Sequence, residues 1–573
     1  MERQSIGVDT FSAENIRNCE KHILSMQRRL DKAVADNDKE GIRETFDLLT
    51  KRSKAVVILA TWRITQHNVG KYTAGVDGIA IPKGQSREYQ NQIRHRIMAE
   101  IDIGKKPDKI KWVYIPKPNG KKQPLGIPTL YDRIVQEMLR IALDPIVEYR
   151  YNGNSHGFRP KRSCQDAMSQ LFLKLAKEDR PRYVLEGDIK GCFDNIKHEH
   201  IIDTLEDWSV PKWATETIGK ILKTEVFQNG EVYDSETGTP QGGVISPLLA
   251  NVALTTLDDF CNKFGTKKSN PIVRYADDFV IVCRSEPEAK EIKEEVAEHL
   301  RCKVGLTLSE EKTKITHIYK GFNFLGFNFR KYKTEIKGGK VKYTLSIRPQ
   351  KERVKDLLEE CKEILDSHKT ATQENVILLL TPKLVGWAMY YRHVVATRTF
   401  SRVDGKLWDK LYRWAKRRHP NKSKGWIMNR YFQRTSERKS HFVDRETNTK
   451  IPMLGKIPIK RFVKVNNDYR VYDKDPQSIE YWNKREYLNA FDQIESVKRK
   501  RLFQKQKGKC PHCKRGITRD DIYEQGMHIH HVVPKSEGGI DDYSNLRLVH
   551  TECHREIHGK KSHGEEVLGQ DKV

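Results

Sequence analysis

The stretch IVRYADDFVIV, Ile272 to Val282, places two adjacent carboxylates in a run of apolar residues that otherwise suits a buried strand. Burying one ionised carboxylate costs free energy, and burying two neighbours costs more unless hydrogen bonds, cations or metal ions compensate. Asp277 and Asp278 could mark a tight hairpin turn, because aspartate tolerates turn conformations. They could equally belong to a charged site, so the rest of the chain has to distinguish the two interpretations.

A third aspartate, Asp188, ends another apolar run in RYVLEGDIKGCFDNI, residues 182–196. If two neighbouring strands bring Asp188 against Asp277 and Asp278, the three carboxylates can hold two Mg²⁺ ions. Two such ions about 4 Å apart activate a 3′-hydroxyl and stabilise a leaving pyrophosphate. This arrangement would be the chemistry of a polymerase.

The composition indicates a large polyanionic partner. The chain has 573 residues, which predicts several domains, and its 105 Lys and Arg against 77 Asp and Glu give a formal net charge of +28. Nucleic acid is the first candidate for such a surface. No apolar run approaches the roughly 20 residues that span a bilayer, and the N-terminus lacks the core of a signal peptide. We therefore expect a soluble, intracellular protein with no membrane partner.

The pattern along the chain predicts alternating helical and mixed regions. Residues 10–65 show helical spacing and predict two or more helices, whereas 68–79 are glycine-rich and loop-like. From about 110 to 330, short apolar runs alternate with helical stretches, which is typical of an α+β domain on a modest sheet. Helical spacing returns over 350–430. Residues 431–507 are basic and polar without clear periodicity, which predicts a small or extended basic region.

That basic region is expected to end in a linker, SVKRKRLFQKQKGK, at 496–509. Within the preceding helical part, the window 401–430 holds ten Lys and Arg residues and two Asp, with aromatic residues between them: Trp408, Tyr412, Trp414 and Trp426. Basic residues grip phosphates, and flat rings either stack on bases or pack helices together. Both roles stay open for these aromatic residues.

The ten cysteines fall into two groups. Seven are scattered singly between Cys19 and Cys361 and are interpreted as reduced core thiols. The other three join a histidine near the C-terminus in a C-x2-C and H-x2-C pattern, made by Cys510, Cys513, His550 and Cys553. This set predicts a tetrahedral, structural Zn²⁺ site, on which so small a segment would depend for folding.

Eight motifs together resemble the successive reverse-transcriptase blocks of group II intron-encoded proteins. In chain order they are GVDG (75–78), IPKPNGKKQPLGIPTLYDRIVQ (115–136), HGFRPKRS (156–163), GDIKGCFDNI (187–196), GTPQGGVISPLLANV (238–252), RYADD (274–278), GLTLSEEKTKI (305–315) and FLGFNF (324–329). The resemblance implies an α+β multidomain fold: a right-hand polymerase with fingers, a palm with an antiparallel sheet and an α-helical thumb, then a small DNA-binding region and a C-terminal ββα-metal HNH zinc module.

By this resemblance, Asp188 and Asp277 bind both catalytic Mg²⁺ ions, with Asp278 as a further carboxylate nearby. The implied nucleotide-binding residues are Lys117 at the triphosphate, Phe193 under the sugar, Gln241 at the incoming base pair, and Gly242 with Gly243, which allow close backbone approach. A core aromatic is the alternative interpretation of Phe193. The 68–79 loop would clamp the template.

A second histidine set near the C-terminus matches the HNH endonuclease pattern. The resemblance implies that His530, His554 and His558 ligate Mg²⁺ or another divalent ion. His531 would be the general base that takes a proton from the attacking water, and Asn545 would orient it through a backbone or side-chain hydrogen bond. A zinc module that only binds DNA is the alternative, and it leaves the histidine spacing unexplained.

The expected domains are N-terminal helices and the template loop (1–80), fingers and palm (81–345), thumb or maturase domain X (346–430), a basic DNA-binding region (431–507) and an HNH endonuclease (508–573). The expected protein is an enzyme with three functions. It would be an RNA-directed DNA polymerase, a maturase that assists splicing of its own intron RNA, and an endonuclease that nicks target DNA to prime reverse transcription.

Its expected partners are group II intron RNA in a ribonucleoprotein, target DNA and dNTPs, with a homodimer also considered. Its expected location is the prokaryotic cytoplasm, associated with the nucleoid when it acts on DNA, or an organelle. Two rivals from other classes remain: an RNA-binding splicing factor with a vestigial polymerase, and a homing endonuclease that uses a polymerase fold only for docking. Primer extension distinguishes the first, and nicking by the 505–573 segment would favour the second.

Overall fold

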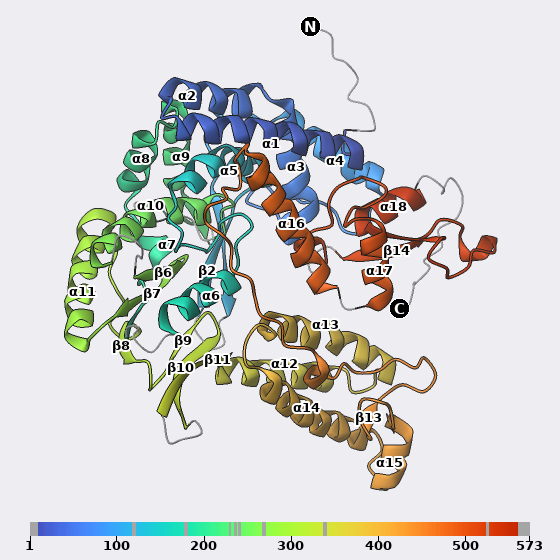
Figure 1. Cartoon of the computed structure of the whole chain (residues 1–573). Coiled ribbons are helices and arrows are strands. Elements are labelled where there is room, and N and C mark those ends of the chain that lie inside the picture. Colours follow the sequence, from blue (N-terminus) through green and yellow to red (C-terminus); the bar gives the residue numbers. More distant parts are fainter. Residues whose placement is uncertain are drawn as a thin grey trace.

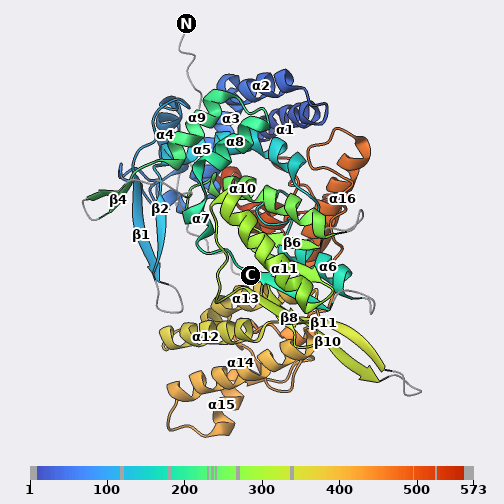
Figure 2. The same ribbon diagram turned by 90° about the vertical axis from the view of Figure 1, so that its left-hand side faces the viewer.

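The computed structural model describes residues 10–116, 122–176, 182–228, 231–233, 238, 242–265, 271–335, 341–494, 496–522 and 526–559. The chain is a mixed α/β protein with small sheets, a helical layer at the top, a helical lower part, and its C-terminal module at the right (Figure 1). The view turned by 90° shows two long hairpins, β1–β2 and β10–β11, that project from the body (Figure 2). None of the helices in the described ranges combines the length and apolar character needed to cross a membrane.

The N-terminal layer is helical, as the spacing over 10–65 predicts. Its helices are α1 (Ala13–Ala35), α2 (Lys39–Asp47), α3 (Lys54–Trp62) and α4 (Arg87–Ala99), with π-helical turns at Leu48–Arg52 and Arg63–His67. The Ser12 hydroxyl caps α1 by accepting a hydrogen bond from the amide of Asn15. The apolar face of α1 packs against α3 and against the long helix α5 (Leu130–Arg150).

The glycine-rich stretch after α3 is a loop with one short 3₁₀ turn, Val69–Tyr72. Arg133 of α5 fixes this loop, since its guanidinium donates to the carbonyls of Gly70 at 2.9 Å and Thr73 at 2.8 Å. A Cβ added at Gly75 would lie 2.8 Å from the backbone of Thr129, so glycine is required for this approach. The expected template loop is therefore anchored at the N-terminus of α5.

The central sheet is antiparallel, with strand order β6-β7-β3-β8. Its strands are β3 (Tyr183–Gly187), β6 (Ile272–Tyr275), β7 (Asp278–Cys283) and β8 (Lys314–His317). Successive residues point to opposite faces, so Leu185 and Ile281 enter one hydrophobic core while Val184 and Val280 enter a second. The sheet therefore separates two cores and is held from both sides.

Helices cover both faces of this sheet (Figures 1 and 2). They are α6 (Cys164–Leu175), α7 (Cys192–Asn195), α8 (His198–Asp207), α9 (Lys212–Leu222), α10 (Ser246–Phe260) and α11 (Glu286–His299), with a 3₁₀ turn at Cys261–Phe264 and a π turn at Leu300–Val304. Helices α8 to α11 share their core with α5, whereas Ala167 and Leu171 of α6 join the other core. Five scattered cysteines are buried free thiols, but Cys302 is exposed.

A second four-stranded sheet lies beside the N-terminal layer, with strand order β2-β1-β4-β5. Its strands are β1 (Ile110–Pro116), β2 (Lys122–Ile127), β4 (Val226–Gln228) and β5 (Glu231–Tyr233). Strands β1 and β4 pair in parallel, and the other pairs are antiparallel. On β1, the side chains of Tyr114 and Ile115 are exposed.

The lower part begins with a three-stranded sheet and continues as helices. Its elements are β9 (Phe322–Phe324), β10 (Phe327–Glu335), β11 (Val341–Pro349), α12 (Lys351–Ser367), α13 (Gln373–Tyr391), α14 (Thr397–Arg418), α15 (Lys424–Tyr431), β12 (Phe432–Gln433), β13 (His441–Phe442) and a 3₁₀ turn at Leu454–Lys456. Trp414 is buried, and Trp408, stacked on Tyr412, packs against the same core. The packing interpretation therefore holds for these three aromatics, while Trp426 is partly exposed.

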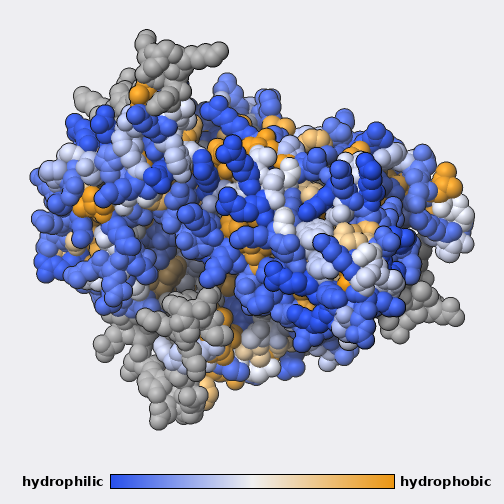
Figure 3. All heavy atoms as spheres, turned by 90° about the horizontal axis from the view of Figure 1, so that it is seen from below, coloured by the Kyte–Doolittle hydropathy of each residue, from blue (hydrophilic) through white to orange (hydrophobic). Residues whose placement is uncertain are grey.

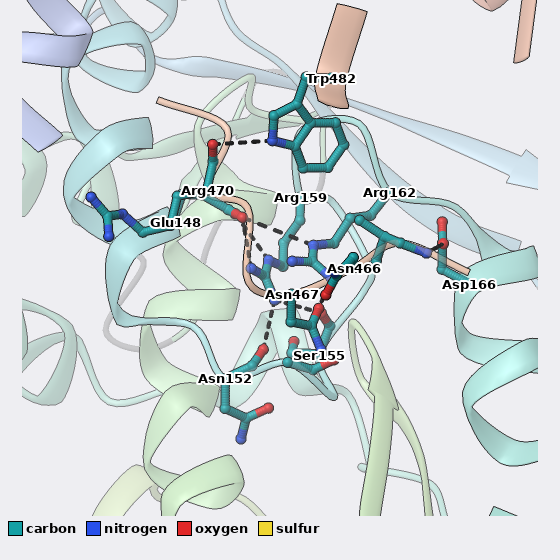
Figure 4. A network of polar contacts seen from close by, with 12 residues as sticks. Glu148, Asn152, Ser155, Arg159, Arg162, Asp166, Asn466, Asn467, Arg470 and Trp482 are labelled. Atoms are coloured by element: carbon teal, nitrogen blue, oxygen red, sulfur yellow. Dashed lines mark hydrogen bonds and ion pairs between the residues drawn. The ribbon is translucent and has the colours of Figure 1, made fainter. Parts of the chain in front are cut away.

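The segment after residue 456 runs back from the lower part to the top layer, and hydrogen bonds to Asp166 of α6 hold it in place. The amide of Val465 donates to Asp166 at 2.8 Å, and Arg485 donates to the same carboxylate oxygen at 2.9 Å. Figure 4 shows Arg162 reaching Asn467, and the indole of Trp482 donating to the carbonyl of Arg470. An extended run is thus followed by helix α16 (Pro476–Gln493), a helix that the expected lack of periodicity did not predict.

The C-terminal module contains α17 (Val497–Lys505), β14 (Met527–His531), a 3₁₀ turn at Lys535–Glu537, β15 (Leu546–His550) and α18 (Thr551–Gly559). The expectation of a linker at 496–509 is wrong, because most of this stretch is helix α17. Its Leu502 and Phe503 are fully buried in one core with Ala490 and Ile494 from the segment before it. These apolar side chains tie α16 and α17 to the module.

The module rests against the N-terminal helices through a contact that we call the joint: Arg515, Glu556, Glu20, Trp62 and Arg87. Arg515 forms an ion pair with Glu20 at 3.7 Å and lies over the ring of Trp62. Arg87 of α4 pairs with Glu556 of α18 at 3.4 Å. The module and the top layer are therefore in direct contact (Figure 1).

Candidate functional sites: a carboxylate cleft and a C-terminal metal module

The three predicted carboxylates meet at one end of the central sheet. Asp188 follows β3, and Asp277 lies in the tight turn that joins β6 to β7, where Tyr275 pairs with Asp278. The register sets Gly187 opposite Phe279, which brings Asp188 beside this turn. A hairpin turn and a charged site are thus not alternatives here, because the turn itself carries the carboxylates.

The electrostatics of the cluster are those of crowded like charges. Partial burial in the cleft, followed by repulsion from Asp277 and Asp188, raises the pKa of Asp278 to about 6. Burial also raises the pKa of Asp277, and the charge of Asp188 adds to the effect. Lys312 partly compensates, since its ammonium donates to both oxygens of Asp188 at 3.1 and 3.2 Å. The carboxylates therefore favour additional positive charge.

A buried arginine holds the carboxylate turn in place. The side chain of Arg274 is completely buried and forms a bidentate ion pair with Asp258 of α10, at 2.9 and 2.6 Å. Its third nitrogen donates to Asn251 at 2.8 Å and to the carbonyl of Ala276 at 2.9 Å. Ala276 has φ of 56°, a conformation that is unfavourable for alanine, so this hydrogen bond secures a strained residue directly before Asp277.

A cleft of about 1110 Å³ opens from the carboxylates toward α12 and α13. Asp188, Asp278 and Lys312 line one end. Arg353 and Lys383 line the other, where they pair with Asp356 and Glu360 of the same lining. Tyr390 and Tyr391 also line it, and their hydroxyls donate to the carbonyls of Leu325 and Gly326. The cleft thus joins the carboxylates to cationic side chains of α12 and α13.

The predicted nucleotide-binding residues are only partly described. Lys117 and Gln241 lie outside the described residues. Phe193, in α7, is half-buried and packs against the core, a position that is compatible with both interpretations. Gly242 has φ of 112°, and a Cβ there would lie 2.3 Å from the carbonyl oxygen of Gly126, so the close approach it permits is to strand β2.

A basic groove of about 590 Å³ runs between α12 and α14. Its cationic lining residues are Lys351, Lys355, Arg402, Lys406, Lys410 and Arg413. Two acidic residues, Glu359 and Asp409, also line it. Seen from below, the molecular surface is hydrophilic over most of its area (Figure 3). The excess of cations makes this groove suited to a phosphate backbone.

The predicted zinc ligands come together in the C-terminal module. Cys510, Cys513, His550 and Cys553 are all buried, and their ligand atoms lie within 4.8 Å of one another. Nδ1 of His550 is 3.4 Å from Sγ of Cys513, while Nε2 lies 3.5 Å from a carboxylate oxygen of Asp521. A carboxylate behind a ligating histidine fixes the tautomer that frees Nδ1 for the metal. The set therefore fits a tetrahedral Zn²⁺ ion.

A three-histidine cluster forms the second candidate metal site. Ligand atoms of His530, His554 and His558 lie within 4.8 Å of one another. His530 is on β14, and the other two occupy one face of α18, as their spacing predicts. The ring of His528 stacks on that of His554 at 4.8 Å. Three imidazoles with one open side suit a catalytic divalent ion.

His531 has a different environment from these three residues. Its Nε2 lies 2.7 Å from Asp541, an exposed residue that sequence reasoning missed. Asp541 is in turn paired with Lys535 at 3.0 Å and with Lys498 of α17 at 3.5 Å. The side chain of Asn545 does not bond to the ring of His531 among the described residues. It bonds to the backbone of Val533 and Ile540 instead.

A carboxylate cluster on an antiparallel sheet, a basic groove and a zinc and histidine module are the features of a nucleic-acid polymerase joined to a nuclease module. Family models agree. The N-terminal domain of reverse transcriptase matches residues 13–92, and reverse transcriptase (RNA-dependent DNA polymerase) matches 115–329. The group II intron maturase-specific domain matches 354–432, and HNH endonuclease matches 510–560.

The similarity to curated relatives agrees with the family models. The chain is 31% identical over 344 residues to Protein YkfC of Escherichia coli, covering 53% of this chain and 87% of that protein. It is 32% identical over 374 residues to the group II intron-encoded protein LtrA of Lactococcus lactis subsp. cremoris. That alignment covers 54% of this chain and spans 61% of the length of LtrA. The chain belongs to the family of group II intron-encoded reverse transcriptases and maturases.

Proposed function

We propose that this chain is a multifunctional group II intron protein that combines an RNA-directed DNA polymerase, a maturase for its own intron RNA and an HNH endonuclease. The observation that carries the proposal is the convergence of Asp188 with the Asp277 and Asp278 turn on the central sheet. The family models for all three activities support it.

In the polymerase, Asp188 and Asp277 hold two Mg²⁺ ions, with Asp278 as a further carboxylate. When bound, the ions activate the primer 3′-hydroxyl and stabilise the leaving pyrophosphate. Lys312 neutralises Asp188 until then, and its exposed, long side chain can withdraw. Arg353 and Lys383 bind the primer and template backbone at the far end of the cleft.

With the carboxylates assigned to the polymerase site, we divide the polymerase into the following domains. Residues 1–80 form the N-terminal helices and the template loop, and 81–345 form the fingers, with the β1–β2 sheet, and the palm, with the central sheet. Residues 346–430 form the thumb or maturase domain X. The 68–79 loop, anchored by Arg133, clamps the template. Phe193 lies under the sugar, and Lys117, Gln241 and Gly242 contact the nucleotide.

The maturase function is assigned to the basic groove between α12 and α14. Its six cations neutralise phosphates of folded intron RNA, and the packed helices give it a fixed shape. Residues 431–507 bind DNA in this proposal, although α16 and α17 share their core with the C-terminal module. Intron RNA and target DNA are therefore the proposed macromolecular partners.

The endonuclease function is assigned to the C-terminal module, residues 508–573. His530, His554 and His558 hold a divalent ion, and His531 takes the proton from the attacking water. Asn545 holds the backbone of the connection that follows His531, so it positions that histidine indirectly. The zinc ion is structural. The nick supplies the 3′ end that the polymerase extends by copying the RNA.

Primer extension on an RNA template with Mg²⁺ and dNTPs tests the polymerase assignment. Asp277→Asn should abolish cDNA synthesis, because it removes one charge and keeps the shape of the side chain. The matched control, Asp203→Asn, changes an exposed aspartate on α8 and should leave synthesis unchanged. If the wild type synthesises no cDNA but binds its intron RNA tightly, an RNA-binding splicing factor with a vestigial polymerase would replace this proposal.

A further inference from the structure

Three branched aliphatic residues are exposed at the end of the C-terminal module. Val532, Val533 and Ile540 expose 51%, 45% and 67% of their surface. All three belong to the connection between β14 and β15, and we call them the apolar tip. Single exposed hydrophobic residues are ordinary on a protein surface, whereas several exposed on one short connection point to a contact with another molecule.

The connection that carries the tip is held in a fixed conformation by hydrogen bonds. The side chain of Asn545 accepts a hydrogen bond from the amide of Val533 at 2.8 Å. Its Nδ2 donates to the carbonyls of Val533 and Ile540, both at 3.0 Å, which holds the two ends of the connection side by side. A Cβ at Gly539 would lie 1.8 Å from the carbonyl oxygen of Val533, so the backbone is tightly packed there. The backbone that carries Val533 and Ile540 is therefore held in place on both sides.

The position of the tip identifies its occupant. Val532 directly follows His531, and His530 before it belongs to the three-histidine cluster. A molecule bound at His531 would therefore lie next to residue 532, where the tip begins. Helix α17 is bound to the same connection, since Lys498 pairs with Asp541 and Lys505 donates to the carbonyl of Tyr543. Its sequence VKRKRLFQK carries five cations, and two of them, Lys498 and Lys505, thus hold α17 against this connection.

We propose that the apolar tip inserts into the minor groove of duplex DNA and opens a base step beside the phosphate that the histidine site cuts. Aliphatic wedges unstack base pairs in this way, and the cations of α17 bind the flanking phosphates. Opening the step presents the backbone to His531 and leaves the new 3′ end frayed for the polymerase. This inference rests on the proposed endonuclease function and specifies its substrate as a locally distorted duplex.

The test separates distortion from cutting by working in a variant that cannot cut. Full-length His531→Ala is mixed with a duplex that carries 2-aminopurine, a base whose fluorescence rises when it is unstacked. It is compared with His531→Ala/Val533→Ser/Ile540→Ser, and binding is followed by fluorescence anisotropy. The control is His531→Ala/Val395→Ser, which changes an aliphatic residue that is 60% exposed in the lower part of the chain.

We expect His531→Ala and its Val395→Ser control to raise the fluorescence severalfold, and the tip variant to give no rise. In the background that can cut, Val533→Ser/Ile540→Ser should raise the KM for nicking by at least about tenfold, since apolar contact area is lost. Thermal melting checks that every variant is folded. An equal fluorescence rise with and without the tip residues, at saturating binding, would overturn the inference.

The outcomes also distinguish this inference from the proposed nuclease. Undiminished nicking by His531→Ala would contradict the assignment of the general base, while the fluorescence comparison would still decide the role of the tip. A tip variant that binds and unstacks DNA normally but loses association with another protein would assign the tip to a protein partner, and the inference would be wrong.

Discussion

The carboxylate cleft and the C-terminal module build their sites in opposite ways. Asp188 and Asp277 come from distant parts of the chain and meet because two large cores hold the central sheet from both sides. The ligands of the zinc site and the histidine cluster all come from residues 510–558, with a small core of their own. The carboxylate cluster depends on long-range packing, whereas the C-terminal module depends on its structural Zn²⁺ ion for folding. Their responses to mutation should differ accordingly.

The largest effect is expected on removing a zinc ligand. Cys513→Ser should unfold the C-terminal module, because structural Zn²⁺ contributes roughly 10–16 kcal/mol to the folding of such segments. Nicking should be lost, while extension of an annealed primer should persist, since the carboxylates are held by other cores. Cys302→Ser, at an exposed scattered cysteine, is the matched control. Loss of primer extension together with nicking would show that the two regions do not fold independently.

The next effect is expected at Arg274. Arg274→Met leaves the buried charge of Asp258 without a partner, which should cost about 3–5 kcal/mol of unfolding free energy and stop primer extension. Urea unfolding and primer extension measure the two consequences. Arg284→Met, at a side chain that is 81% exposed, is the control.

A second variant separates stability from positioning at this site. Arg274→Met/Asp258→Val removes both charges and should recover much of the stability. Extension should stay low, because the carbonyl of Ala276 has still lost its donor beside Asp277. Full recovery of both properties would mean that Arg274 acts through stability alone.

A smaller effect is expected at Asp541. Because its carboxylate accepts from Nε2 of His531 and fixes the ring, Asp541→Asn should lower the kcat for nicking by about 10–100-fold with little change in DNA binding. Asp520→Asn, at an exposed aspartate of the same module, serves as control. If Asp541→Asn left the kcat for nicking unchanged, the hydrogen bond to Asp541 would not be what orients His531.

The smallest effect is expected at His67, which lies beside the joint. Burial lowers the pKa of His67 to about 4, and both ring nitrogens are buried without hydrogen-bond partners. The unfolded chain therefore binds an extra proton between pH 6.5 and 4, so stability is complete above pH 6.5 and falls as the pH drops toward 4. Between pH 7.5 and 5.5 the loss of unfolding free energy should be on the order of 1–2 kcal/mol.

Melting temperatures at pH 7.5 and 5.5, with Zn²⁺ present, test this prediction. His67→Phe keeps the contact of the ring with Trp62 but cannot take up a proton, so it should lose part of the pH dependence of the wild type. If the wild type and His67→Phe showed the same pH dependence, other groups, such as the zinc ligands, would be responsible for that dependence.

The ligands and carboxylates of the sites could be predicted from the sequence better than the contacts that hold them in place. The zinc ligands could be predicted because Cys510, Cys513, His550 and Cys553 have a characteristic spacing, and the structure brings them together. The convergence of Asp188 with Asp277 could be expected because each ends or joins an apolar strand. The stretch that was taken for a linker is helix α17, since two buried apolar residues outweigh its basic composition.

The supporting contacts could not be predicted, because they join residues with no common local pattern. Asp166 accepts from Val465 and Arg485 across some 300 positions, and nothing near Asp258 marks it as the partner of Arg274. The joint between Arg515 and Glu20 is of the same kind. Asp541 offers one weak local signal, since it lies ten residues after His531 within the same connection.

The most direct test of the account is a reciprocal measurement on two full-length variants. Primer extension from an annealed primer and nicking of target DNA by the intron ribonucleoprotein are measured for Asp277→Asn and for His558→Ala. We predict that Asp277→Asn loses extension and keeps nicking, and that His558→Ala loses nicking and keeps extension. Loss of both activities in either variant would contradict two separate chemical centres on one chain.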